Sequence, residues 1–214
     1  MGKFRTTSLV SRNRRMTVGL LGGSFNPAHE GHLHISREAL KRLNLDQVWW
    51  MVSPQNPLKS ESGMAGFEDR FQSAKAMARD PRIRVTDIER RLGTRQTAET
   101  LTKLTKMLPE IRFVWLMGAD NLLQIHRWYR WTKIFTTVPL AVFARPTYDS
   151  RALAGQAAAR FARAYLPDRF APGLAYRAPP AWMFLAIRRH AASATAIRAS
   201  GGFPSSSRSD EPDE

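Results

Sequence analysis

The chain has 214 residues, 43% of them hydrophobic, which suits one sizeable globular core and is too little for two comfortable domains. It contains no cysteine, so disulfide bridges and thiolate metal sites are excluded, and we expect a cytoplasmic protein. No apolar run approaches the ~20 residues that a membrane span needs, and the opening MGKFRTTSLVSRNRRM lacks the apolar core of a secretory signal.

The formal net charge is +15. Residues 1–15 hold five basic residues and no acid, and the remaining chain keeps 28 basic against 18 acidic residues. This excess suits a polyanionic partner, either a nucleic acid or a phosphorylated small molecule. Because no basic block is interleaved with aromatic residues, we expect a small-molecule partner and consider nucleic acid unlikely.

From residue 17 onward, strand patterns alternate with helix patterns. In chain order they predict a strand at Thr17–Leu21, a helix at Glu30–Leu43, a strand at Gln47–Val52, a helix at Phe67–Arg79, an extended segment at Ile83–Val85 that reaches Ile88, and a helix at Thr97–Leu108. They continue with a strand at Ile111–Met117, two short helices within Asn121–Phe135, a strand at Pro139–Ala144, a helix at Arg151–Tyr165, a strand at Trp182–Ile187 and a last helix at Ala194–Ala199.

This alternation predicts an α/β fold with a doubly wound, mostly parallel sheet. We expect a single domain at residues 17–199, preceded by a basic flexible leader at 1–16 and followed by a disordered tail at 200–214.

A glycine turn follows the first predicted strand in the sequence GLLGGSFNPAHEGH, residues 19–32. The order strand, turn, helix puts Gly22, Gly23, Ser24 and Phe25 at the carboxyl edge of the sheet, where ligands of open α/β sheets bind. Glycine lets a phosphate approach the main chain. Neither G-x-G-x-x-G nor G-x-x-x-x-G-K-[ST] is present, so the turn predicts a phosphate site of another kind.

His29 and His32 lie one helical turn apart just after this turn, so both can face the same phosphate. A zinc motif H-E-x-x-H would need histidine at position 33, which is Leu33, and no third ligand is evidently placed. The other alternative is a pair of capping or core histidines. We interpret the pair as phosphate ligands because they occur together with the glycine turn.

These residues carry a family resemblance. GGSFNPAHEGH resembles the G-x-F-x-P-x-H-x-G-H signature of the nucleotidyltransferase superfamily, and SATAIR, residues 193–198, resembles its I-S-S-T-x-I-R signature. SPQNPLK, TAETL and GADNL followed by W-Y-x-W resemble segments of the bacterial nicotinate-nucleotide adenylyltransferases. The sequence departs from the family pattern at Asn26, where many members have Asp, at Ala194 and at Leu58.

The resemblance implies a Rossmann-like nucleotidyltransferase fold and a reaction in which nicotinate mononucleotide attacks the α-phosphorus of ATP, with no covalent enzyme intermediate. It gives His29, His32 and Arg198 catalytic roles. It implies further ATP contacts from Gly22, Gly23, Ser24, Phe25, Asp120, Ser193 and Thr195. Mg²⁺ would be held mainly by the phosphates, without a protein metal site.

The acceptor nucleotide would be bound by residues that the same resemblance assigns: Asn26, Lys59, Thr97, Trp128, Tyr129 and Arg145. Trp128 would stack on the pyridine ring, and the pyridine carboxylate would meet Thr97 and main-chain N–H groups near Trp128 and Tyr129. The spacing of Trp131 from Trp128 favours a core position for Trp131. A homo-oligomer is possible.

Three alternatives stay open. A sister nucleotidyltransferase would share the ATP half and use nicotinamide mononucleotide or another phosphorylated acceptor. A basic nucleic-acid-binding protein would show salt-steep affinity and no nucleotide turnover. An aminoacyl-tRNA synthetase fragment is disfavoured because no K-M-S-K-S segment follows.

Overall fold

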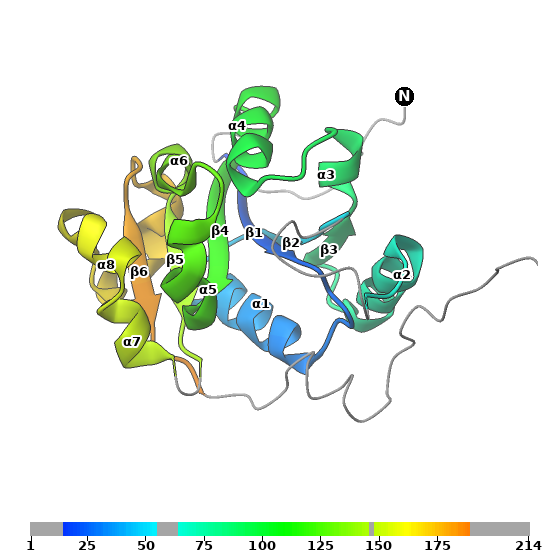
Figure 1. The fold of residues 1–214 in the computed structure, drawn as a ribbon, viewed down its shortest axis with the longest axis horizontal. Coiled ribbons are helices and arrows are strands. Elements are labelled where there is room, and N and C mark those ends of the chain that lie inside the picture. The colour runs from blue at the N-terminus through cyan, green and yellow to red at the C-terminus, as the bar shows by residue number, and fades with distance from the viewer. Residues whose placement is uncertain (1–14, 55–63, 146–147, 189–214) are drawn as a thin grey trace, which may run out of the picture.

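A computed structural model describes residues 15–54, 64–145 and 148–188 of the chain (Figure 1). Several predicted features lie outside these residues. They are Lys59, Ser193, Thr195, Arg198, the helix at Ala194–Ala199, the tail at 200–214 and nearly all of the leader.

One parallel sheet forms the centre of the molecule. Its strands are β1 (Thr17–Gly23), β2 (Gln47–Val52), β3 (Ile83–Thr86), β4 (Arg112–Gly118), β5 (Leu140–Phe143) and β6 (Trp182–Leu185). They lie in the order β3-β2-β1-β4-β5-β6, and every neighbouring pair is parallel. The prediction of a doubly wound, mostly parallel sheet is therefore confirmed. The strand order reverses between β1 and β4, which is the position where such sheets bind ligands.

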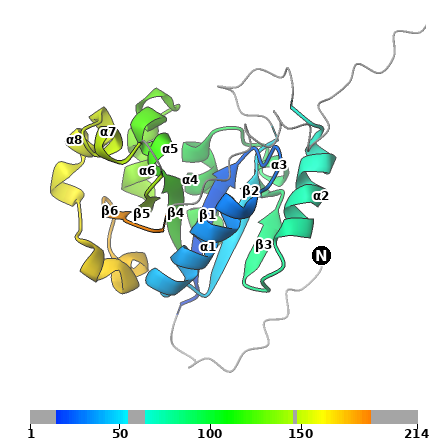
Figure 2. The ribbon, with the colours of Figure 1, turned by 90° about the horizontal axis from the view of Figure 1, so that it is seen from below.

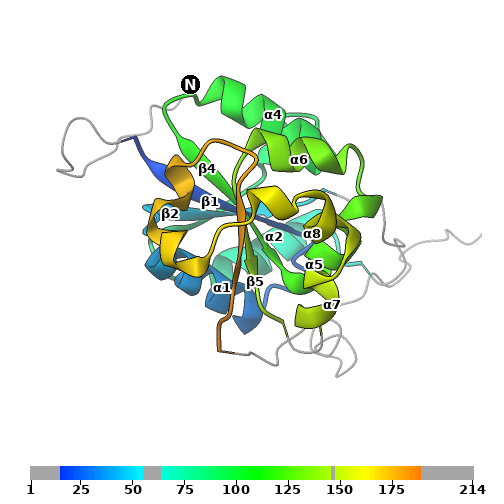
Figure 3. The ribbon, with the colours of Figure 1, turned by 90° about the vertical axis from the view of Figure 1, so that its left-hand side faces the viewer.

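Helices cover both faces of this sheet, as Figure 3 shows with α4 and α6 on one side and α1 and α2 on the other. The first layer comprises α1 (Glu30–Arg42), α2 (Phe67–Met77) and the 3-10 helix η3 (Asp168–Tyr176). The second comprises α4 (Thr97–Met107), α5 (Ala119–Gln124), α6 (Trp131–Thr137), α7 (Asp149–Leu153) and α8 (Gln156–Arg160). Figure 2 shows α1 lying across β1 and β2.

Alternation along the strands explains the two layers. In β4, Val114 and Leu116 pack against the α1 layer, whereas Phe113, Trp115 and Met117 pack against the α4 layer. Successive side chains of a strand point to opposite faces, so a strand covered on both sides reads as one continuous apolar run.

Two element predictions were wrong. Ile88 is not extended but begins the short helix α3 (Ile88–Arg91). The pairing of β3 with β2 ends at Thr86 and Met51, so no strand partner remains for Ile88. The helix predicted at Arg151–Tyr165 is divided into α7, α8 and the 3-10 helix η2 (Ala162–Ala164). The break falls at Gly155, which is extended at ψ 167° and caps α8.

The segment Asn121–Phe135 does hold two short helices, α5 and α6, joined by the 3-10 helix η1 (Ile125–Arg127). Among the described residues, no helix is both long enough and apolar enough to cross a membrane.

Candidate active site

The glycine turn lies where β1 ends, next to the end of β4 and immediately before α1. Gly22 is required by packing, because a Cβ there would lie 2.5 Å from Cη2 of Trp115. A Cβ on Gly23 would approach only the Phe25 ring, at 3.4 Å. Packing therefore does not require glycine at position 23. Close approach of a phosphate to the main chain would require it.

Phe25 fixes the shape of the turn. Its φ is +46°, in the left-handed region. Its ring is buried and stacks on Trp50, with ring centres 5.2 Å apart. Burial of this ring offsets the cost of the unusual backbone conformation.

The two histidines form a reciprocal cap at the start of α1. Nδ1 of His29 accepts the backbone N–H of Gly31, and Nδ1 of His32 accepts the backbone N–H of His29, both at 3.1 Å. Their ring centres lie 3.9 Å apart. Because both Nδ1 atoms are acceptors, the neutral rings carry their protons on Nε2. The capping alternative and the phosphate alternative are thus compatible, since capping uses one nitrogen of each ring.

Two consecutive hydrogen bonds connect Trp50 of β2 to the backbone of His32. The indole Nε1 of Trp50 donates to Oγ of Ser36 at 2.7 Å, and Ser36 donates to the carbonyl oxygen of His32 at 2.8 Å. The Phe25 ring lies 4.6 Å from the His32 ring. The sequence placed Trp50 in a predicted strand, but it gave no signal for this hydrogen bond.

Arg70 of α2 is a second feature that sequence reasoning missed. Only 1% of the residue is exposed, and its guanidinium donates to four backbone carbonyls. Nε donates to Ala65 at 3.0 Å. Nη1 donates to Ser24 at 2.7 Å and to Ser53 at 2.8 Å, and Nη2 donates to Pro54 at 3.0 Å. Nothing in the local sequence distinguishes Arg70 from the other basic residues.

Asn26 and His34 connect the same region to distant segments. Asn26 is buried, and its Oδ1 accepts the backbone N–H of Ala65 at 3.2 Å. Nε2 of His34 lies 2.6 Å from the carbonyl oxygen of Arg188. The described chain therefore ends beside α1, shortly before Ser193 in the sequence.

Asp120 and Arg145 come together at the ends of β4 and β5. Nε of Arg145 lies 3.5 Å from Oδ1 of Asp120, which makes the contact an ion pair without hydrogen-bond geometry. The backbone N–H of Arg145 also donates to Asp149 at 2.7 Å. Both side chains flank Gly118, whose missing Cβ leaves room for them. Two residues assigned separately from the sequence are thus neighbours.

Thr97, Trp128 and Tyr129 lie at or between helices on the α4 side of the sheet. Thr97 is the first residue of α4, and Trp128 and Tyr129 lie between η1 and α6. Trp128 is half-buried, and its backbone N–H already donates to the carbonyl of Ile125 at 2.8 Å. Tyr129 is exposed. Trp131 is half-buried and packs edge-on against Phe135 and Phe161, so it lies at the margin of the second core and not within it.

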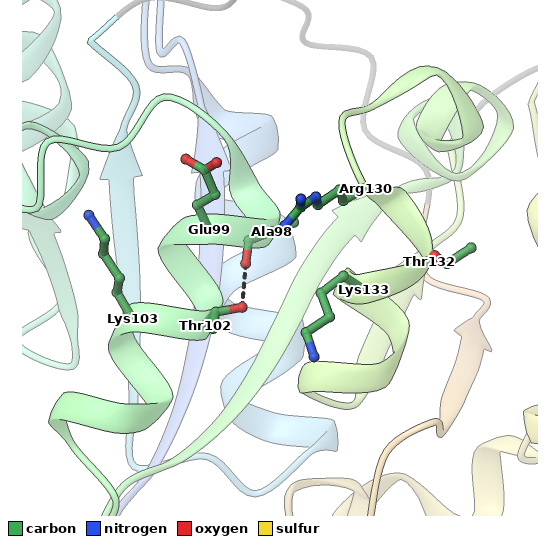
Figure 4. Close-up of a pocket in the computed structure, with 7 residues that line it drawn as sticks. All are labelled: Ala98, Glu99, Thr102, Lys103, Arg130, Thr132 and Lys133. Atoms are coloured by element: carbon green, nitrogen blue, oxygen red, sulfur yellow. Dashed lines mark hydrogen bonds between the residues drawn. The ribbon is translucent and has the colours of Figure 1, made fainter.

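A surface pocket of about 630 Å³ lies between α4 and α6 (Figure 4). It is lined by Ala98, Glu99, Thr102, Lys103, Arg130, Thr132 and Lys133. It contains none of the predicted site residues, although Ala98 and Arg130 follow Thr97 and Tyr129 directly in sequence. We therefore place the candidate site at the strand ends and not in this pocket.

Glu89 is a buried carboxyl close to the end of β2. Its Oε1 accepts from Thr100 at 3.2 Å, and Ser53 supplies a further hydrogen bond. Burial raises the pKa of Glu89 from 4.5 to about 7. Burial favours the neutral form of a carboxyl more than these two hydrogen bonds favour the charged form.

Protein ligands for a metal ion are sparse. Within residues 15–54, 64–145 and 148–188, no three His, Asp or Glu side chains gather as a metal site would require. A metal ion that is bound by the phosphates of a nucleotide would need few ligands from the protein.

The chain is similar to known proteins over most of its length. The family model described as cytidylyltransferase-like matches residues 20–200. The chain is 55% identical to a Parvibaculum lavamentivorans protein over 88% of this chain and 94% of that one, and 52% identical to a Roseobacter denitrificans protein over 87% and 93%. Both relatives carry the name "Probable nicotinate-nucleotide adenylyltransferase".

A solved structure shares the fold. Plasmodium falciparum nicotinic acid mononucleotide adenylyltransferase, complexed with NaAD, is similar with a TM-score of 0.63 at 15% identity, over 86% of this chain and 83% of that one. The family match and the high identity to the bacterial relatives together establish that the chain belongs to the cytidylyltransferase-like family and, within it, to the nicotinate-nucleotide adenylyltransferases.

Proposed function

We propose that the protein transfers the adenylyl group of ATP to nicotinate mononucleotide, forming nicotinate adenine dinucleotide and pyrophosphate. The observation that carries this proposal is the pair of backbone-capped imidazoles beside the glycine turn, at the point where the strand order reverses. The names of the bacterial relatives support the nicotinate form of the acceptor.

The reaction needs no nucleophile from the protein. A 5′-phosphate oxygen of the acceptor attacks the α-phosphorus of ATP while the bond to the bridging oxygen of the β-phosphate breaks, and pyrophosphate leaves. The protein must bring two anions together in line, and such positioning contributes about 7–11 kcal/mol. The remaining demand is to stabilise charge on the phosphate oxygens in the transition state.

His29 and His32 meet that demand by donating from Nε2. The tautomer is already set by the N–H groups bonded to each Nδ1, so no ring must reorient during the reaction. Main-chain N–H groups of Gly23, Ser24 and Phe25 add donors at the turn. Ser193, Thr195 and Arg198 would bind the β- and γ-phosphates. The contact between His34 and Arg188 supports this by bringing the preceding segment to α1.

Mg²⁺ would be bound by the ATP phosphates, where it neutralises part of their charge. On the acceptor side, Lys59 and Arg145 would meet the phosphate, and Thr97 with the Tyr129 N–H would meet the pyridine carboxylate. Trp128 would stack on the ring, and Asp120 would contact the adenosine side. Asn26 would also contribute to the acceptor site, and its buried side chain accepts the backbone N–H of Ala65.

A pyrophosphate-release assay with ATP, Mg²⁺ and a panel of acceptors tests the proposal. We expect nicotinate mononucleotide to be used better than nicotinamide mononucleotide or phosphopantetheine. Equal turnover of the amide form would contradict the acid preference. The absence of turnover with every acceptor would contradict the enzymatic function itself.

A further inference from the structure

We propose that Arg70 is a positioning residue for this reaction, holding the glycine turn in register with the residues that follow β2. The inference rests on the proposed function and adds to it a residue that touches no substrate. Its basis is the set of four carbonyl oxygens that the buried guanidinium joins.

The guanidinium acts across three separate stretches of chain. Ser24 belongs to the turn after β1, Ser53 and Pro54 follow β2, and Ala65 precedes α2. Ser24 and Arg70 are 46 residues apart. The turn and the end of β2 are also joined by the N–H of Ser53, which donates to the carbonyl of Gly23 at 2.9 Å. The hydrogen bonds from Arg70 fix the spacing between these segments.

The bond to Ser24 also orients an amide of the turn. In a planar trans peptide, the carbonyl and the N–H point in opposite directions. Because the Ser24 carbonyl faces the guanidinium, the N–H of Phe25 in the same peptide points away from it. This is one of the donors that the proposed function assigns to the ATP phosphates.

The chemistry of the site requires arginine rather than another cation. The four bonds use the planar fork of Nε, Nη1 and Nη2, whereas lysine offers three donors at one point. No carboxylate among the described residues lies within ion-pair distance of Arg70, so its charge is not neutralised by a neighbour. A buried positive charge in contact with the turn favours a polyanionic ligand there.

Kinetics of Arg70→Lys test the proposal. We expect kcat to fall by about 100-fold, as a displacement of about 1 Å does, with a smaller rise in the KM for ATP. Arg79→Lys, an exposed arginine just after α2, is the matched control and keeps wild-type kinetics. Leu104→Ala, in the opposite layer, lowers Tm by a core cavity and keeps kcat when assayed well below its Tm. An Arg70→Lys kcat equal to that of Leu104→Ala would overturn the proposal.

A second measurement does not depend on turnover. In protein labelled with ¹⁵N-phenylalanine, the Phe25 amide resonance, assigned through Phe25→Leu, should shift in Arg70→Lys and stay in place in Arg79→Lys. An unmoved resonance would overturn the inference, whether or not the wild-type protein releases pyrophosphate. A wild-type protein that releases no pyrophosphate would count against the proposed function alone.

If Arg70→Lys does not fold, Phe67→Leu takes its place. The Phe67 ring lies 5.5 Å from the Arg70 guanidinium, so the variant removes support for the fork and keeps its donors. We expect a smaller loss of kcat and a smaller shift of the Phe25 resonance in the same direction. Wild-type values for both would overturn the proposal.

Discussion

Nδ1 of His32 accepts the backbone N–H of His29 at 3.1 Å, and the two rings lie 3.9 Å apart centre to centre. The backbone of α1 thereby sets the tautomer of both rings before any ligand arrives. The two side chains that form the N-terminal cap are the ones that we propose as phosphate donors.

His32→Ala should lower kcat by about 100–1000-fold, the loss typical for removal of one donor to a developing oxyanion. ATP binding should weaken much less, because the main chain of the turn remains. Pyrophosphate release and calorimetric titration with Mg–ATP separate the two effects. A variant with normal kcat would show that His32 acts only as a cap.

Gly22→Ala and Gly23→Ala should differ in kind. The Cβ of Ala at 22 overlaps the Trp115 ring, so urea unfolding should show a loss of about 1–3 kcal/mol. The Cβ at 23 meets only ordinary contacts, so stability should change little while the KM for ATP rises. Unchanged kinetics of Gly23→Ala would mean that phosphate does not approach this residue.

Burial of Glu89 should make stability depend on pH. Its pKa is raised from 4.5 to about 7, so the stability it contributes is full below pH 4.5 and is lost as pH rises through 7. Glu89→Gln lacks this titration. The unfolding free energy of wild type, relative to this variant, should fall by about 3 kcal/mol between pH 4.5 and pH 8. A difference that is flat with pH would show that Glu89 titrates normally.

Asp120 and Arg145 should behave as one unit in kinetics. Removing either partner leaves the other without its counter-ion at the strand ends, so Asp120→Asn and Arg145→Met should each lower kcat/KM. Their effects in the double variant should be less than additive, with a coupling of about 0.5–1 kcal/mol for this partly exposed pair. Strict additivity would mean that the two residues act independently.

Local patterns were sufficient to predict the strands and their mostly parallel arrangement, although not the order of the strands in the sheet. Strands such as β4 are apolar on both faces and end at a glycine, and these signals lie within a few residues of one another. The same patterns missed the break at Gly155, because a run of alanine and arginine favours a helix regardless of the tertiary packing around it.

The sequence predicted which site residues lie close together only where those residues are neighbours in the chain. The turn and the histidines belong to one motif, so their proximity could be predicted. Arg70 and Glu89 reach Ser24 and Ser53 across long stretches of chain, and such contacts have no periodicity to detect. The burial of Asn26 was missed for the same reason, since its partner Ala65 is 39 residues away.

The hydrogen bond between His34 and Arg188 joins two residues that are 154 positions apart in the sequence. The first turns of the helix that carries both imidazoles are thereby fastened to the exit of the last strand. Because this bond joins the two segments directly, slow amide exchange at residues 30–34 and at 185–188 should be lost together on gentle heating.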